Sequence, residues 1–200
     1  MRSLSASAAA ALAALLILGG SAGAEVRVSD DSGATIVLPQ PARRIVSLAP
    51  HLTEQLFAIG AGSRIVGTTD FADYPEPAKA LPRVARAHNV DLERVAALKP
   101  DLIVIWGSGF PPATLAALRR LGVPMVVDEP STLDAIAASM LRLGTLAAAD
   151  GATEAAAKFR AAIGRLRARY AGRAEVTVFY QIWSQPLMTL GGRHVLSEAL

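Results

Sequence analysis

Short apolar runs alternate with longer stretches of helical periodicity from residue 45 onward. One of these runs, Leu-Ile-Val-Ile-Trp, is apolar on both faces, as expected of a strand inside a parallel sheet. Strands and helices that alternate at this spacing predict an α/β fold whose parallel strands are joined by right-handed crossovers. The expected strands are residues 45–48, 64–69, 101–106 and 123–127, and the expected helices are residues 53–59, 91–98, 111–121 and 131–146.

Residues with helix-end preferences stand at the predicted boundaries. Thr53 and Asp91 occupy positions where an N-terminal cap is expected, and Gly60 stands where the first helix should stop. Ser131 and Asp134 together form a plausible capping box for the fourth helix. The sequence therefore predicts where the helices begin as well as their order.

Further segments precede and follow this alternating region. Residues 25–38 have the pattern of a β-hairpin with an Asp-Asp-Ser-Gly turn, and residues 152–170 form a long helical stretch. A new strand is expected at residues 175–183, and the chain then enters what resembles the first helix of a second α/β unit. The predicted division is a leader (1–24), a first α/β lobe (25–149), a bridging helix (150–172) and the start of an incomplete second lobe (173–200).

The N-terminus has the three-part pattern of a cleavable signal peptide. Arg2 is the only charged residue before Glu25, residues 8–18 are apolar, and Ala-Gly-Ala at 22–24 offers small residues for cleavage. The apolar run is shorter than the roughly 20 residues that a spanning helix needs, although an uncleaved anchor remains the alternative. We expect an exported protein.

Composition narrows the class of protein. The chain has no cysteine, so neither a disulfide nor a lipid anchor on cysteine is available, and its stability must come from the core. The formal net charge is +3, and the one local cluster of arginines, at residues 165–173, is expected to be a solvated helix face. A nucleic-acid-binding protein would be expected to carry a larger basic patch, so no nucleic-acid partner is predicted.

Aromatic and polar residues collect where the predicted strands end. Ligands of open parallel sheets bind outside the carboxyl ends of the strands, so these residues are candidates for a binding cleft. Each aromatic could instead pack only its own lobe, but as a set they favour a flat, partly apolar ligand between two lobes. The candidate ligand-binding residues are His51, Phe71, Tyr74, His88, Trp106, Tyr180 and Trp183.

Motifs for catalysis are absent from the sequence. The chain has no G-x-S-x-G elbow, no P-loop and no G-x-G-x-x-G, and its histidines lack the spacing of a zinc helix. His51, His88 and His194 lie in three separate loops and could meet at a zinc or haem iron. Histidines in such positions are more often hydrogen-bonded surface residues, so no metal site is predicted.

Three segments resemble one family of transport proteins. They are residues 44–54, Arg-Ile-Val-Ser-Leu-Ala-Pro-His-Leu-Thr-Glu, residues 66–75 and residues 91–104. Together they are similar to the periplasmic vitamin B12-binding proteins of ABC importers. Residues 28–33 resemble the start of the wider siderophore, haem and cobalamin binding class, and residues 180–189 look most like its cobalamin branch.

The resemblance implies two Rossmann-like lobes joined by a rigid helix, with a corrinoid held in the cleft. Phe71 matches a position where the family places an aromatic ring against the corrin, and Glu93 matches a glutamate that pairs with arginines of the permease. The chain departs from the family at Ala87 and His88, where a tryptophan can face the ligand. Family members are longer, which implies that most of the second lobe is truncated. The alternative is that Glu93 has no docking role and is only a favourable charge at a helix start.

The sequence thus predicts a monomeric periplasmic protein that carries cobalamin to an inner-membrane ABC importer. Cobalamin is then the transported ligand, no cofactor is needed, and no reaction is catalysed. A haem or ferric-siderophore binding protein of the same class is the first alternative. The rival from another class is a metal-dependent cleft enzyme.

Overall fold

The computed structural model describes residues 25–86, 89–192 and 194–200. The predicted signal peptide and the predicted ligand residue His88 lie outside the described residues. Among the helices in these ranges, none combines the length and the hydropathy that crossing a bilayer requires.

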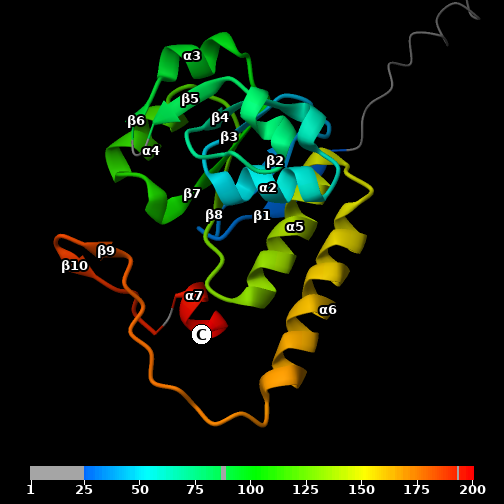
Figure 1. Ribbon diagram of the computed structural model, residues 1–200. Helices are drawn as coiled ribbons and strands as arrows, with labels where there is room; N and C mark the ends of the chain where they lie inside the picture. The colour runs from blue at the N-terminus through cyan, green and yellow to red at the C-terminus, as the bar shows by residue number, and fades with distance from the viewer. Residues whose placement is uncertain (1–24, 87–88, 193) are drawn as a thin grey trace, which may run out of the picture.

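A six-stranded sheet forms the centre of the fold (Figure 1). Its strands are parallel except for the short edge strand β6, which runs antiparallel to β5. The α/β class predicted from the sequence is confirmed. In spatial order the strands are β6 (Asn89–Val90), β5 (Arg83–Arg86), β4 (Ile65–Thr69), β3 (Ile45–Ser47), β7 (Leu102–Trp106) and β8 (Met125–Asp128).

Helices cover both faces of the sheet, and the central strands are apolar on both faces for this reason. In β7, Leu102 and Val104 join the core beneath one helical layer, while Ile103 and Ile105 join the core beneath the other. The first layer contains α2 (Pro50–Ala58), α5 (Leu133–Ala147) and, packed alongside α5, α6 (Ala152–Tyr170). The second layer contains α3 (Leu92–Ala97) and α4 (Pro112–Arg119).

The N-terminal hairpin forms as predicted. β1 (Val26–Ser29) pairs antiparallel with β2 (Thr35–Leu38), and Gly33 in the turn has a φ of 82°, a conformation that glycine adopts without steric cost. Leu38 is buried in the core beneath α2 and α5. The hairpin is therefore part of the first helical layer and is not a free arm.

Two helices begin at different residues from those predicted. α2 starts at Pro50 instead of Thr53, because a proline fits the first turn of a helix, where its missing N–H is not needed. Thr53 faces inward, and its hydroxyl hydrogen-bonds the side chains of Ser47 at 2.9 Å and Thr68 at 2.8 Å. At α5 the cap is Thr132, whose side chain accepts from the backbone of Ala135, so the predicted box of Ser131 and Asp134 is wrong.

The other helix ends follow the sequence signals. Asp91 caps α3 by accepting from the backbone N–H of Arg94 at 2.9 Å, as predicted. Gly60 and Gly122 follow α2 and α4 with φ values of 84° and 71°. The long helix α6 has the bounds expected from its composition.

Two strands were missed and one was predicted wrongly. β5 and β6 are short strands at one edge of the sheet. β5 carries an arginine at each end, so its sequence does not contain an apolar run long enough to predict a strand. The strand expected at residues 175–183 is not formed. Only the two-residue strands β9 (Trp183–Ser184) and β10 (Leu187–Met188) pair there, because a strand without a neighbour cannot satisfy its backbone hydrogen bonds.

The C-terminal segment contacts the rest of the protein through its last helix. Glu198 in α7 (Val195–Ala199) accepts from the backbone N–H of Leu133 at 2.6 Å and forms an ion pair with Arg167. These contacts connect α7 to the start of α5 and to the end of α6. The division of the chain into a first lobe, a bridging helix and a second lobe stays a prediction.

Candidate functional site

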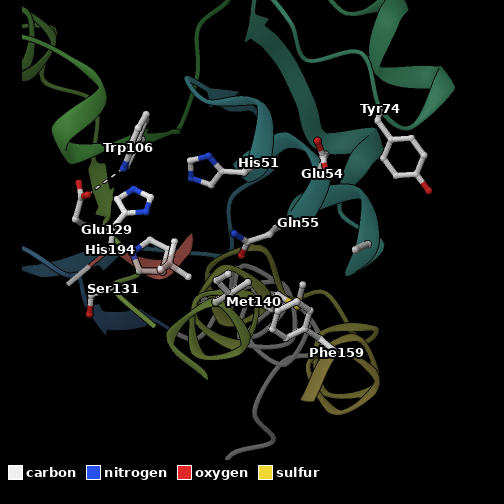
Figure 2. A pocket seen from close by; sticks show the side chains of 14 residues that line it. His51, Glu54, Gln55, Tyr74, Trp106, Glu129, Ser131, Met140, Phe159 and His194 are labelled. Atoms are coloured by element: carbon white, nitrogen blue, oxygen red, sulfur yellow. Dashed lines mark hydrogen bonds between the residues drawn. The ribbon is translucent and has the colours of Figure 1, made fainter. Parts of the chain in front are cut away.

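A cavity of about 730 Å³ opens at the carboxyl ends of β3, β7 and β8 (Figure 2). This is the edge at which open parallel sheets bind ligands. The helices α2, α5 and α6 and the first residues of the C-terminal helix complete its wall. The lining residues are His51, Glu54, Gln55, Ala58, Tyr74, Trp106, Glu129, Pro130, Ser131, Ile136, Met140, Phe159, His194 and Val195.

Three of the seven predicted ligand residues line this cavity. They are His51 at the start of α2, Trp106 at the end of β7 and Tyr74, whose side chain is 69% exposed. Tyr74 points away from the other labelled side chains in Figure 2, which places it at the rim. These three residues come from separate segments, so the fold brings together groups that the sequence only suggested.

Three other predicted residues lie away from the cavity. Phe71 is 76% exposed in the turn after β4, where its φ is 66°, and Trp183 is 62% exposed on β9. Tyr180 is also exposed, in the segment that precedes β9. Their roles toward a ligand stay predictions.

Trp106 is held between two side chains in the cavity wall (Figure 2). Its indole Nε1 donates to Oε1 of Glu129 at 3.0 Å. The ring of His51 meets the indole edge-on, with ring centroids 5.8 Å apart and planes at 85°. Such T-shaped contacts are favourable because the positive edge of one ring faces the negative face of the other.

The carboxylate of Glu129 binds the loop that follows β7. Besides the indole, Oε1 accepts from Oγ of Ser108 at 2.8 Å and Oε2 accepts from the backbone N–H of Ser108 at 2.6 Å. The backbone N–H of Glu129 donates to Oδ2 of Asp31 at 2.6 Å. Glu129 is thus fixed at both its side chain and its backbone.

A partly buried ionic network connects this part of the site to the N-terminal hairpin. Arg142 forms two hydrogen bonds to Asp31, at 2.7 and 2.8 Å, and one to Oδ1 of Asp128 at 2.9 Å. The side chain of Asp128 is fully buried, and burial raises its pKa even though Ser139 and Arg142 act in the opposite direction. Asp30 accepts from the backbone N–H of Val127 at 2.9 Å. The hairpin turn is therefore clamped to the end of β8.

Two polar side chains of α2 present hydrogen-bonding atoms at the cavity wall. Nε2 of His51 and Oε1 of Gln55 are buried and have no hydrogen-bond partner among the described residues. Burial lowers the pKa of His51, and the charges of Asp128 and Glu129 offset this effect only in part. His51 is therefore held as a neutral ring at physiological pH.

The charge of the cavity wall is one-sided. Its titratable groups are Glu54, Glu129, Tyr74 and the histidines His51 and His194, and none of the described lining residues is a lysine or arginine. Within the described ranges, no three His, Cys, Asp or Glu side chains are grouped so as to hold a metal ion. The wall suits a ligand that is neutral or cationic, with polar groups that can hydrogen-bond.

Several lining residues were not singled out from the sequence as ligand-binding residues. Glu54 is the last residue of the motif that contains His51 and Gln55 follows it directly, so their place on the first turns of α2 could have suggested them. Glu129 lies two residues after the predicted strand 123–127 and directly follows the observed strand β8, which is a usable signal. Met140 and Phe159 carry only the apolar periodicity of core residues, and nothing in the sequence distinguishes them.

Glu93 lies far from this cavity in the fold. It stands exposed in the first turn of α3, in the second helical layer, and Asp91 precedes it as the cap. Its side chain forms no hydrogen bond or ion pair with another described residue. Its position is compatible with a contact to another protein.

Sequence comparison places the chain in a known class. Residues 45–200 match the family described as periplasmic binding protein. The chain belongs to this family.

Two relatives of this chain are vitamin B12-binding proteins. The chain is 40% identical to a vitamin B12-binding protein of Vibrio cholerae over 161 residues, which are 80% of this chain and 58% of the relative. It is 38% identical to a protein of the same name from Yersinia pestis, over 82% of this chain and 60% of the relative. The chain thus spans less than two thirds of the length of these relatives.

Two solved structures of periplasmic binding proteins are similar to the fold of this chain. The periplasmic vitamin B12-binding protein of Vibrio cholerae superposes with a TM-score of 0.73 at 40% identity, over 79% of this chain and 62% of that one. A periplasmic haem-binding protein of Pseudomonas aeruginosa gives a TM-score of 0.58 at 27% identity, over 65% of this chain and 47% of that one.

Proposed function

We propose that this chain belongs to a periplasmic carrier that captures cobalamin and delivers it to an ABC importer of the inner membrane. Cobalamin is the cargo, so the carrier needs no resident cofactor and catalyses no reaction. In this proposal residues 1–24 are a cleaved leader, residues 25–149 form the first lobe, and α6 bridges to a second lobe that begins after residue 172. The carrier acts as a monomer.

The observation that carries the proposal is the chemistry of the cavity wall. It combines the indole of Trp106 and the ring of Phe159 with hydrogen-bonding side chains, and its described residues include no basic group. A corrinoid offers a broad apolar ring system surrounded by neutral amides, which hydrogen-bond but need no counter-ion. The identity to vitamin B12-binding proteins supports the same ligand.

Haem is the second candidate, and two observations favour it. His51 and His194 both line the cavity, and imidazole is a common axial ligand of haem iron. The haem-binding protein of Pseudomonas aeruginosa also shares the fold. Against haem stands its pair of carboxylates, which would enter a wall that already contains Glu54 and Glu129.

Absorbance titrations of the purified protein with cyanocobalamin and with haemin separate these candidates. We expect saturable binding of cyanocobalamin with quenching of tryptophan fluorescence, and weaker, non-saturating changes with haemin. A sharp Soret shift with haemin that is lost in His51→Ala or His194→Ala, together with no response to cyanocobalamin, would instead assign haem.

Phe71, Tyr180 and Trp183 have a place in this proposal although they lie outside the cavity described above. Their rings are exposed and are borne on the turn after β4 and on the segment around β9. A ligand larger than the cavity, or a movement of the C-terminal segment toward the first lobe, would bring them into contact. Alanine substitution of Phe71 is expected to weaken cyanocobalamin binding, since aromatic stacking contributes about 0.5–1.5 kcal/mol beyond buried area.

A further inference from the structure

We infer that Glu129 is a positioning residue that fixes the indole of Trp106 in the wall of the cavity. The effect on ligand affinity rests on the proposed function, whereas the effect on the indole itself does not. Glu129 follows β8 and Trp106 ends the neighbouring strand β7, so parallel pairing of these strands brings the two residues to one edge of the sheet.

The hydrogen bonds of Glu129 are directed at Trp106 and its loop. Its carboxylate accepts from Nε1 of Trp106, from Oγ of Ser108 and from the backbone N–H of Ser108, at 2.6 to 3.0 Å. Hydrogen bonds to an ionised acceptor are roughly twice as strong as neutral ones. The carboxylate therefore holds the polar edge of the indole against the loop.

Two glycines let this loop close on the indole and on the carboxylate. A Cβ atom at Gly109 would lie 2.6 Å from Cε3 of Trp106, and one at Gly107 would lie 3.0 Å from Oε2 of Glu129 and 2.8 Å from Val127. Separations below about 3 Å require a neighbour to move. A side chain at either glycine would thus displace the ring or its partner.

His51 contacts the indole as well, through the edge-on contact between their rings. Glu129 itself is fixed by the bond from its backbone N–H to Asp31. The indole is consequently held by three elements, namely α2, the loop after β7 and the residue after β8. We define these residues, His51, Gly107, Ser108, Gly109 and Glu129, as the Trp106 socket.

The socket has a consequence for what the cavity can recognise. Because Glu129 accepts the indole N–H, this donor is not available to a ligand, and Trp106 presents carbon surface only. An indole that is already ordered also loses little conformational freedom when a ligand binds. The socket thus favours a broad apolar ligand surface at this point of the wall.

The first experiment measures the indole without any ligand. Trp106 and Trp183 are the only tryptophans of the chain, so the substitution Trp183→Phe makes Trp106 the sole indole reporter. In this background we expect Glu129→Ala and Gly109→Ala to lower the fluorescence anisotropy of Trp106 and to increase its quenching by acrylamide. Glu129→Gln keeps one acceptor oxygen but turns an amide donor toward the loop, so its effect should be intermediate.

Glu54→Gln is the matched control, because it also removes a carboxylate from the cavity wall but has no hydrogen bond to Trp106. It should leave the Trp106 signals unchanged. Unchanged signals in Glu129→Ala and Gly109→Ala, with the fold verified by circular dichroism, would overturn the inference. Trp106 signals that change equally in Glu54→Gln would also overturn the inference, since the loss of a negative charge from the cavity wall would then explain the change.

The second experiment measures cyanocobalamin affinity in the same variants. We expect the Kd to rise about 3- to 10-fold in Glu129→Ala, the range set by ordering a side chain on binding. If affinity falls while the Trp106 signals stay constant, Glu129 acts on the ligand directly and the positioning role is wrong. If the unsubstituted protein itself binds no cyanocobalamin, the proposed function fails, and the ligand-free measurements still decide the role of Glu129.

Discussion

At the scale of single residues, Arg142 connects the two carboxylates of the network next to the cavity. We expect Arg142→Met to destabilise the fold by about 3–5 kcal/mol, because a fully buried Asp128 would lose its charge partner. Chemical denaturation of the two proteins measures this difference.

The exposed ion pair of Arg160 with Asp134 provides the control for this substitution. Its side chains are 44% and 73% exposed, so Arg160→Met should change the free energy of unfolding by only about 0–1 kcal/mol. Equal effects of Arg142→Met and Arg160→Met would show that the Asp128 pair contributes no more than a surface contact.

His51 should make stability depend on pH. Burial holds its pKa in the folded protein below the ordinary value of 6.5, so the unfolded chain binds the proton more tightly. The stability associated with neutral His51 is therefore present above about pH 6.5 and is lost as the pH falls toward the lowered pKa. The stability advantage of the natural protein over His51→Gln should shrink over this range in denaturation curves recorded at several pH values. An advantage that is constant with pH would contradict the assignment.

Position at a strand end was the residue-scale signal used to choose candidate ligand residues, and the binding role of the chosen residues stays a prediction. His51 and Trp106 were found because the carboxyl ends of parallel strands meet at one edge, and both line the cavity. Glu129 also lies at a strand end but was not selected, because the selection favoured aromatic side chains and histidines. Its partner Ser108 and the tight approach of Gly109 depend on three-dimensional packing, which no local pattern encodes.

At the scale of elements, the contact between α5 and α6 relies on a missing side chain. A Cβ atom at Gly144 would lie 2.2 Å from Cβ of Ala152, at the place where α6 begins. We expect Gly144→Ala to force the two helices apart and to cost about 1–3 kcal/mol, the usual cost of overpacking. Thermal unfolding measures the change.

Gly164 serves as the control on the same pair of helices. A Cβ atom there meets nothing within 4 Å, so Gly164→Ala should stabilise α6 by up to about 1 kcal/mol through helix propensity. A stabilising Gly144→Ala would mean that the helices adjust without strain.

Elements were predictable where local pattern and tertiary packing agree. β7 and α6 were predicted with nearly their observed bounds, because β7 is apolar on both faces and α6 has a long helical composition. α2 begins three residues early because Pro50 starts it and Thr53 is needed inside. The strand expected at residues 175–183 is not formed, because a strand needs a second strand to pair with and the segment's own sequence does not supply one.

At the scale of the whole molecule, the cavity and Glu93 belong to different helical layers. The cavity opens on the side of α2 and α5, whereas Glu93 stands exposed on α3. The carrier that we propose would need two functions, since it would have to hold its cargo and also dock on the permease. Their separation means that one can be changed without the other.

Glu93→Ala tests the docking role proposed for this carboxylate. A charge in the first turn of a helix contributes only about 0.3–1 kcal/mol, so folding and cyanocobalamin affinity should be nearly unchanged. Binding to the importer should weaken by about 2–5 kcal/mol, because an arginine of the permease would be left unpaired in a desolvated interface. Pull-down with the reconstituted importer and uptake of labelled cobalamin measure this loss.

Glu154→Ala removes a comparable exposed glutamate from the first turn of α6 and should dock normally. If Glu93→Ala docks and transports as well as Glu154→Ala, Glu93 is only a favourable charge at a helix start.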